Sequence, residues 1–166
     1  MLILLKKPIP QAITEILVID EQSPSGLKYI KSGKSAGTKL KSGNWQICYK
    51  KGGYMAHRII WFLHTGEDPL EQEIDHIDRN PSNNKINNLR LATRSQNCIN
   101  KTTCSISGYR GVYRSGKGNR WKACILDKHI GTFSTKEEAA LAFDKAAKEL
   151  YEGFASLNQA TIKSPT

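Results

Sequence analysis

The middle of the chain alternates between short apolar runs and polar turn residues, and this pattern constrains the fold more than any other feature. The runs Glu73–Asp78 and Leu89–Ala92 predict two short strands, and the Pro, Ser and Asn residues between them predict a loop. Thr93 precedes Gln96 by three residues, which is the capping-box spacing, so a helix is expected to begin near Arg94. The sequence therefore predicts a unit of strand, loop, strand and helix.

Three polar side chains of this unit are of the types that bind a metal ion and accept a proton. The carboxylate of Asp75 and the side-chain carbonyl of Asn97 are oxygen ligands of the kind that Mg²⁺ prefers in proteins. A neutral imidazole such as that of His76 accepts a proton near neutral pH. Asp75 and His76 are neighbours, so on a strand their side chains point to opposite faces. These residue types favour phosphodiester hydrolysis, with a metal ion on one side and a general base on the other.

The charge of the chain favours a polyanionic partner. Lys and Arg number 25 against 15 Asp and Glu, which gives a formal net charge of +10 at pH 7. Nucleic acid is the first expectation, an anionic membrane surface is the second, and a charge that serves only solubility is the competing interpretation.

The N-terminal apolar run is too short for a signal peptide, and its charges follow the run instead of preceding it. No stretch has the apolar length of a membrane span, so a cytoplasmic protein is expected. The four cysteines contain no Cys-x-x-Cys pair, so no structural zinc is expected. Cys98 and Cys104 are candidates for a disulfide, but in a reducing compartment free and partly buried thiols are the stronger expectation. The cysteines are Cys48, Cys98, Cys104 and Cys124.

Several elements are expected before the central unit. Thr14–Asp20 predicts a strand, and Lys31–Gly43, rich in Lys, Ser and Gly, predicts a flexible basic loop with little to bury. Trp45–Tyr49 and Tyr54–Ala56 predict a hairpin. A short buried helix is expected from His57, ending at a glycine.

The last third of the chain predicts a small sheet and one helix. Three strands are expected, at Tyr109–Arg114, Arg120–Asp127 and His129–Phe133, with a turn at Asp127–Lys128 joining the last two. On the middle strand, alternation places Trp121, Ala123 and Ile125 on one face, toward the helix. The other face carries Arg120, Lys122, Cys124 and Leu126.

The helix of this region has clear start and stop signals. Ser134 and Thr135 each precede a Glu by three residues, and Gly153 is expected to end the helix. Apolar residues at helical spacing predict the packed face: Ala139, Phe143, Ala146 and Leu150.

The combination of Asp75-His76, Asn87-Asn88-Leu89-Arg90 and Asn97 resembles the HNH motif of phage and intron-encoded homing endonucleases. The upstream segment Ala56–Trp61 and the following Gly66 are also similar to the segment that precedes the motif in these phage enzymes. The resemblance implies a ββα-metal finger.

The same resemblance implies roles for four residues. Asp75 and Asn97 are expected to bind one divalent metal ion, Mg²⁺ with Mn²⁺ as the alternative. His76 is expected to be the general base, and Asn88 to brace the loop around it. Arg90 and His57 are candidates for phosphate contacts, against the alternatives of a solvated Arg90 and a structural His57. The remaining polar residues are expected to form turns only: Asp78, Asn80, Asn83, Asn84 and Asn87.

The third region resembles the Apetala-two/ethylene-response-factor (AP2/ERF) DNA-binding domain, through Gly108-Tyr-Arg-Gly-Val-Tyr113, Arg120-Trp121-Lys122-Ala123, Ile130-Gly131-Thr132-Phe133 and Glu137–Asp144. The resemblance implies a three-stranded sheet that reads DNA. DNA-facing residues are expected at Arg110, Gly111, Tyr113, Arg114, Lys117, Arg120, Lys122 and His129. Base specificity is not transferred, because uncharged residues stand where plant members usually carry charged readers: Tyr113, Ser115, Cys124 and Leu126.

Together these patterns predict an α+β protein. The expected divisions are a nuclease domain at 1–100, a linker at 101–107, a DNA-binding domain at 108–158 and a tail at 159–166. The leading hypothesis is a metal-dependent homing endonuclease that nicks one strand of double-stranded DNA as a monomer, with dimerisation for a double-strand cut. The alternative is a sequence-specific DNA-binding regulator with a degenerate motif. A structural zinc protein is disfavoured by the cysteine spacing.

Overall fold

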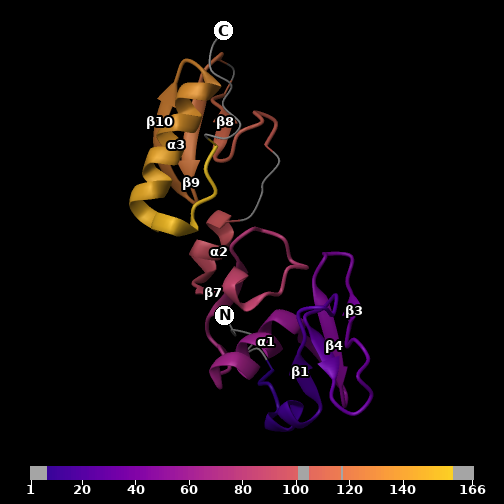
Figure 1. Ribbon diagram of the computed structural model, residues 1–166. Helices are drawn as coiled ribbons and strands as arrows, with labels where there is room; N and C mark the ends of the chain where they lie inside the picture. The colour runs from indigo at the N-terminus through magenta and orange to yellow at the C-terminus, as the bar shows by residue number, and fades with distance from the viewer. Residues whose placement is uncertain (1–6, 101–104, 117, 159–166) are drawn as a thin grey trace. The chain divides into compact units, whose positions relative to one another are not determined.

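The computed structural model describes residues 7–100, 105–116 and 118–158. The chain divides into two units, Met1–Arg94 and Ser95–Thr166 (Figure 1). Both units combine helices with small antiparallel sheets, so the α+β class is confirmed. The division falls inside a helix and not in the expected linker 101–107, of which 101–104 lie outside the described residues.

The first unit contains three small sheets and one longer helix. Strands β1 and β2 pair, β3, β4 and β5 form a three-stranded sheet, and β6 and β7 form a hairpin. In chain order, the elements are a 3-10 helix Gln11–Glu15, β1 Leu17–Ile19, β2 Leu27–Tyr29, β3 Thr38–Lys39, β4 Trp45–Tyr49, β5 Gly52–Met55, α1 Ala56–Thr65, β6 Glu73–His76, a 3-10 helix Ile86–Asn88 and β7 Leu89–Ala92.

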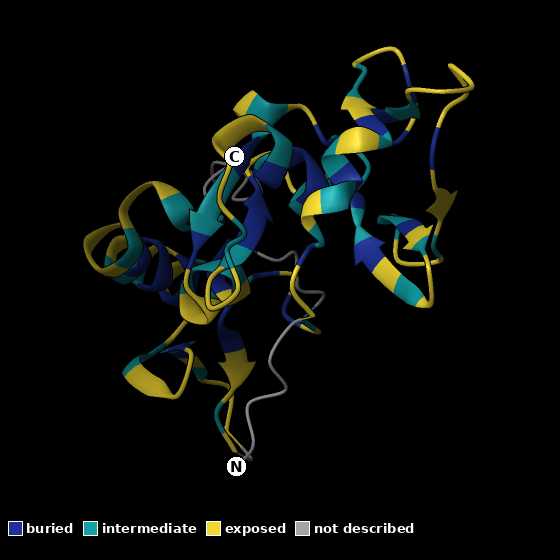
Figure 2. Ribbon diagram, turned by 90° about the horizontal axis from the view of Figure 1, so that it is seen from below, coloured by how far each residue is buried: buried dark blue, intermediate teal, exposed yellow. Residues whose placement is uncertain are grey.

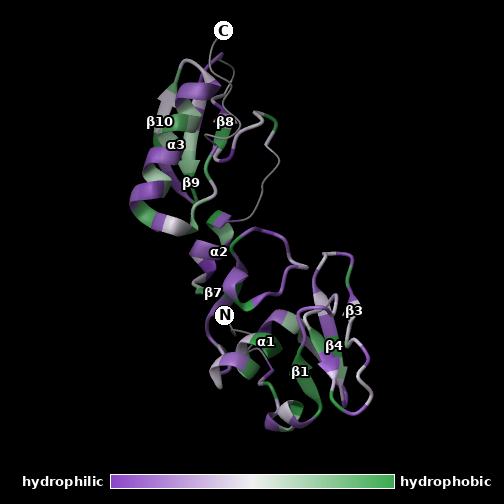
Figure 3. Ribbon diagram, in the orientation of Figure 1, coloured by the Kyte–Doolittle hydropathy of each residue, from purple (hydrophilic) through white to green (hydrophobic). Residues whose placement is uncertain are grey.

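The core of the first unit is formed by aliphatic residues that are at most 1% exposed, from the first 3-10 helix, from α1 and from three strands. Buried residues line the inner sides of the elements, whereas the connecting turns are mostly exposed (Figure 2). Strand β1 is among the hydrophobic elements (Figure 3). The most buried aliphatic side chains are Ile13, Leu17, Leu27, Ile47, Ile59 and Ile60.

Two expectations for the first 43 residues are wrong. The predicted strand Thr14–Asp20 begins in a 3-10 helix, because Ile13 and Leu17 are spaced by about one helical turn and are both buried. The segment Lys31–Gly43 is not a loop with little to bury. It contains β3, which pairs with β4, and Ala36 is 1% exposed.

Helix α1 is held to the N-terminal segment by one carboxylate. The Arg58 guanidinium donates to both oxygens of Asp68, at 2.6 and 2.8 Å. Asp68 Oδ2 also accepts from the backbone N–H of Ile9 at 2.7 Å. Helix α1 ends at Gly66, as predicted, with a φ of +80° and an N–H that donates to Phe62 O.

The second unit is a three-stranded antiparallel sheet with a helix on one face, as predicted (Figure 1). The strand order is β10-β9-β8. The elements are α2 Arg94–Asn100, of which Arg94 counts with the first unit, β8 Val112–Arg114, β9 Trp121–Ile125, β10 Lys128–Phe133, α3 Lys136–Tyr151 and a 3-10 helix Glu152–Phe154.

Helix α3 begins as the sequence predicts and ends differently. Thr135 Oγ1 accepts from the Glu138 N–H, and the Glu138 side chain accepts from the Thr135 N–H, which completes a capping box. The helix ends at Tyr151, and Glu152 takes a φ of +42°, so Gly153 is not the stop.

The packed face of α3 is shifted from the predicted one. Ala139, Ala140, Phe143 and Ala147 are buried, whereas Leu150 is 53% exposed.

The turn between β9 and β10 lies one residue earlier than predicted. Ile125 pairs with Lys128, so Leu126 and Asp127 form the turn. Leu126 has a φ of +50°, and a positive φ at the first central residue is found in the favoured two-residue hairpin turns. The face of β9 that packs on α3 is nevertheless the predicted one, with Ala123 and Ile125 buried.

Within the described residues, no helix is long and apolar enough to cross a membrane. Cys48, Cys98 and Cys124 are free thiols, and the first two are exposed instead of partly buried. Cys104 lies outside the described residues, so the candidate disulfide between Cys98 and Cys104 stays untested.

We predict that Gly111→Ala lowers the free energy of unfolding of the second unit by more than the strain of a positive φ alone would. Gly111 has a φ of +68°, and an added Cβ would overlap the Phe143 ring and lie 2.5 Å from the Cys124 carbonyl oxygen. Backbone strain costs about 1–2 kcal/mol and overpacking a further ~1–3 kcal/mol. The measurement is thermal unfolding followed by circular dichroism.

The matched control is Gly108→Ala. Gly108 has a similar φ of +78°, but an added Cβ meets no heavy atom within 4 Å. This variant should lose only the backbone part, about 1–2 kcal/mol. Equal losses in the two variants would contradict the packing role of Gly111.

Candidate nuclease site

Asp75 and His76 are consecutive residues of strand β6 in the β6–β7 hairpin, and both are buried in the first unit. Asp75 is 4% exposed and His76 is 7% exposed. The antiparallel register pairs Asp75 with Arg90 and His76 with Leu89. Two adjacent buried polar residues on one strand need partners on both faces, because neighbouring side chains point to opposite sides.

Asp75 receives its partner from the adjacent strand. Arg90 Nε and Nη2 both lie 2.9 Å from Asp75 Oδ2. Arg90 is not simply solvated, because it binds Asp75, whereas its phosphate contact stays a prediction. The arginine neutralises the buried carboxylate, a charge that is costly to bury unpaired.

His76 receives its partner from the loop. Its Nε2 lies 3.0 Å from Asn84 Oδ1, and Asn84 Nδ2 donates to the backbone carbonyl of Ser25 at 2.9 Å. Asn84 is 4% exposed. The expectation that Asn84 only forms a turn is therefore wrong: its side chain spans from His76 to the β1–β2 connection, 59 residues away in sequence.

The loop between the strands is held by Asp78 and Asn88. Asn88 Nδ2 donates to Asp78 Oδ1 at 2.9 Å and to Asn83 O at 2.8 Å, and Asn88 Oδ1 accepts from the Asp78 N–H at 3.1 Å. Asn83 Nδ2 donates to Asp78 Oδ2 at 2.7 Å. Asn88 thus contacts both ends of the loop that begins directly after His76.

Asp78 and Asn80 also form the expected turns, since each side chain accepts from a backbone N–H two residues later. Burial raises the pKa of the Asp78 carboxyl. Hydrogen bonds from Asn83, the Asn80 N–H and Asn88 together outweigh that effect, and the positive charge of a protonated His76 adds to them. The net result is a pKa below the ordinary value of 3.8.

His57, the first residue after the start of α1, lies against His76. The two ring centroids are 5.2 Å apart and the rings are nearly perpendicular, at 84°. His57 therefore packs on the ring of His76, whereas its expected phosphate contact stays a prediction.

Asn97 lies on α2 and is half-buried. Its place in the second unit leaves the pairing of Asp75 and Asn97 around one metal ion as a prediction. Among the described residues, no group of three or more His, Cys, Asp or Glu side chains could hold a metal ion. The buried Asp75 carboxylate nevertheless suits a hard divalent cation, because it is an anionic oxygen donor of the kind that Mg²⁺ prefers in proteins.

The sheet of the second unit presents one face away from α3, here called the outer face. Strand pairing aligns Tyr113, Lys122 and Thr132 in one row and Cys124 with His129 in another. Arg120 Nη2 donates to Thr132 O at 3.3 Å. The outer face comprises Tyr113, Arg120, Lys122, Cys124, His129 and Thr132, and its cationic residues are exposed.

Three predicted DNA contacts lie elsewhere. Arg110 donates to the Ile99 carbonyl at the end of α2, and its N–H donates to Asn158 Oδ1, so it binds within the unit. Gly111 allows the chain to pass close to Phe143. Arg114 pairs with Trp121, on the face opposite the outer one, with its guanidinium 6.0 Å from the indole centroid. Lys117 lies outside the described residues.

Comparison with known proteins finds a family match for the central segment. A family model described as "HNH endonuclease" matches residues 54–98, which include α1, both strands of the hairpin and most of α2.

Residues 54–98, here called the HNH domain, match the HNH endonuclease family.

The relatives that match are viral and plant proteins. The chain is 37% identical over 124 residues to a protein named uncharacterized HNH endonuclease of Acanthamoeba polyphaga mimivirus, covering 72% of this chain and 64% of that protein. It is 35% identical over 71 residues to Protein 3.8 of Escherichia phage T7, covering 42% of this chain and 59% of the phage protein. The chain thus spans about three fifths of the length of these two relatives.

A shorter similarity concerns a plant protein. An AP2-like ethylene-responsive transcription factor of Oryza sativa is 51% identical over 47 residues, which are 25% of this chain and 7% of that factor. This short match adds weak support to the AP2/ERF resemblance of the second unit.

Sequence reasoning missed two residues of the HNH domain, Asp78 and Asn84. Asp78 accepts hydrogen bonds from three donors of the loop. In the sequence, its position two residues before Asn80 indicates only a turn. Asn84 contacts a backbone carbonyl of a distant hairpin, and no local pattern in the sequence indicates such a contact.

We predict that Asp78→Asn lowers the stability of the HNH domain in a pH-dependent way. The Asp78 pKa is lower in the folded chain than its ordinary 3.8, so the carboxylate stabilises the fold above about pH 3.8. This contribution is lost as the pH falls through the lower, folded-state pKa.

The measurement is the melting temperature of the parent and of Asp78→Asn between acidic and neutral pH. The parent should melt higher at neutral pH, and the difference should shrink below about pH 3.8. Glu71→Gln, at an exposed carboxylate outside the loop, is the control. A difference that is constant at all pH values would exclude the charge of Asp78 as the cause.

Proposed function

We propose that the chain is a metal-dependent DNA endonuclease of the homing type that nicks one strand of a duplex. The observation that carries this proposal is the buried Asp75-His76 pair of the HNH domain, with an arginine on the carboxylate and an amide oxygen on the imidazole. A neutral imidazole held in one orientation is suited to take a proton from an attacking water.

In the proposed mechanism, His76 is the general base, and Asp75 and Asn97 hold one divalent ion, Mg²⁺ or Mn²⁺. The ion would neutralise charge on the phosphate and stabilise the leaving oxygen. Asn88 keeps the loop after His76 in place through its bonds to Asp78 and Asn83. Arg90 holds the Asp75 carboxylate on one side of the strand.

The charge distribution supports duplex DNA as the substrate. No Asp or Glu occurs between Glu21 and Glu67, a stretch that carries seven Lys. In the second unit, the outer face carries exposed Arg120, Lys122 and His129. A small sheet with a cationic face fits the major groove and binds phosphates. We propose that this face grips DNA while the HNH domain cuts it, with the chain acting as a monomer.

We predict that His76→Ala reduces nicking of a supercoiled plasmid by about 10²–10⁴-fold, because it removes the general base. Nicking by the parent should require Mg²⁺ or Mn²⁺ and stop with a chelator. His64→Ala, at an exposed histidine of α1, is the control and should nick at the parent rate. Equal nicking by the parent and His76→Ala would remove His76 from the mechanism. DNA binding by a parent that never nicks would instead favour a DNA-binding regulator.

We predict that Arg120→Ala combined with Lys122→Ala weakens duplex binding and lowers its salt dependence. Each lost phosphate contact reduces the slope of log affinity against log salt by about 0.9, so the double variant should lose up to ~2. Lys145→Ala combined with Lys148→Ala, which removes two charges from α3, is the matched control. Equal slopes for both double variants would show that the outer face does not bind DNA.

A further inference from the structure

Asn84 makes two buried hydrogen bonds whose chemistry determines how His76 carries its proton. The Asn84 side chain is almost fully buried, with Nδ2 at 2.9 Å from Ser25 O and Oδ1 at 3.0 Å from His76 Nε2. A backbone carbonyl can only accept a hydrogen bond. The amide nitrogen must therefore face Ser25, and the amide oxygen must face His76.

The orientation of this amide restricts the imidazole. A neutral imidazole has one N–H donor and one acceptor nitrogen. Because Asn84 Oδ1 can only accept, His76 Nε2 must carry the hydrogen. The lone pair then lies on Nδ1, at the other side of the ring.

We propose that Asn84 is a positioning residue that fixes His76 in the Nε2–H tautomer and makes Nδ1 the proton-accepting atom. The catalytic part of this inference rests on the proposed function. In that reaction, an O–H bond of water breaks and its proton goes to Nδ1. The water oxygen bonds to phosphorus, the P–O3′ bond breaks, and the 3′ oxygen takes a proton from solvent. The imidazolium then returns its proton to solvent.

The carbonyl that binds Asn84 Nδ2 belongs to Ser25, in the N-terminal part of the chain and outside the matched segment 54–98. Ser25 is fully buried, and its side chain donates to Leu27 O within the β1–β2 connection. Gly26 has a φ of +82°, and an added Cβ would lie 2.8 Å from Ile60 Cδ1 and 3.4 Å from Asn84 Cβ. Gly26 thus supplies the left-handed backbone of the turn, which passes close to Ile60 and to the loop at Asn84.

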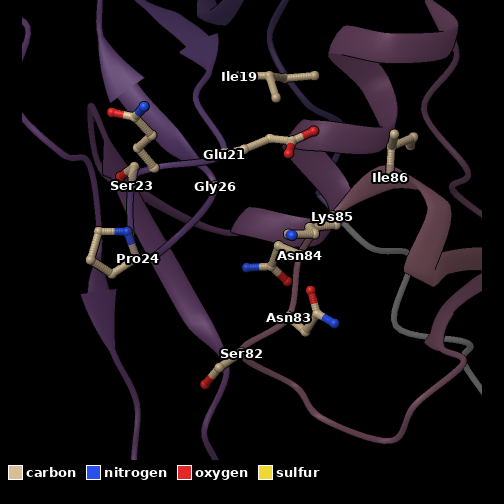
Figure 4. Close-up of a pocket in the computed structure, with 11 residues that line it drawn as sticks. Ile19, Glu21, Ser23, Pro24, Gly26, Ser82, Asn83, Asn84, Lys85 and Ile86 are labelled. Carbon is tan, nitrogen blue, oxygen red and sulfur yellow. The ribbon is translucent and has the colours of Figure 1, made fainter.

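Figure 4 shows the two segments facing each other across a pocket. Ser23, Pro24 and Gly26 lie on one side, and the loop residues from Ser82 to Ile86 lie on the other. Asn84 lies on the loop side of this pocket. The β1–β2 turn and the loop after His76 are thus separate pieces of chain that one amide joins.

The test reads the tautomer directly, by long-range ¹H–¹⁵N NMR of the full chain without metal at alkaline pH. The chain has four histidines, and the spectrum of His76→Ala identifies the signals of His76. The parent should show a protonated Nε2 and an unprotonated Nδ1. A His76 with its hydrogen on Nδ1 would overturn the inference, whether or not the protein cleaves DNA.

Two substitutions separate positioning from structural support. Asn84→Leu removes the acceptor and the donor, whereas Asn84→Asp keeps an acceptor toward His76 and loses only the donor to Ser25. The tautomer should become mixed in Asn84→Leu and stay Nε2–H in Asn84→Asp. Asn87→Ala, at an exposed amide of the same loop, should leave the spectrum unchanged.

Kinetic measurements test the catalytic part of the inference. Asn84→Leu should lower kcat for nicking by about 10- to 100-fold, with the affinity for duplex DNA unchanged. Asn84→Asp should retain more of kcat than Asn84→Leu. If both variants lose kcat equally while only one changes the tautomer, positioning is not the function of Asn84. A parent with the expected tautomer and no nicking would refute the proposed function and leave the tautomer assignment standing.

Discussion

A carboxylate that is only 4% exposed needs a positive charge beside it, and the rest of the HNH domain depends on how Asp75 meets this requirement. The antiparallel register brings Arg90 opposite Asp75, at 2.9 Å from one carboxylate oxygen. With the strand fixed in this way, the next residue, His76, must turn to the other side. The imidazole meets Asn84 of the loop and His57 of α1.

The loop is ordered by polar contacts instead of by a hydrophobic core. Asp78 accepts from Asn83, Asn88 and the Asn80 N–H, and each of these bonds joins two parts of the loop. Asn84 alone among these amides turns inward, toward His76 and Ser25. The loop thus combines an exposed network that holds its own shape with one buried contact that reaches the imidazole.

Patterns with a local cause were predictable from the sequence. The β7 strand, the start of α2, the capping box of Thr135 and the packing face of β9 follow from alternation and capping spacing. The predictions that failed lack a clear local signal. The segment Lys31–Gly43 is rich in Lys, Ser and Gly, yet it contains the two-residue strand β3, which pairs with β4 directly after it. The hydrogen bond from Arg110 to the Ile99 carbonyl was also not predictable, because nothing near Arg110 in sequence indicates it.

The Ser25–Asn84 contact also bears on where the protein can be cut or transplanted. The segment that sequence similarity marks as the HNH domain begins at residue 54, but the amide beside His76 is anchored by a carbonyl from residue 25. A minimal fragment or a chimaera built on the similarity boundary would keep every motif residue and discard the anchor. The smallest transferable piece of this site therefore includes Ser25 and begins well upstream of the segment that matches the family.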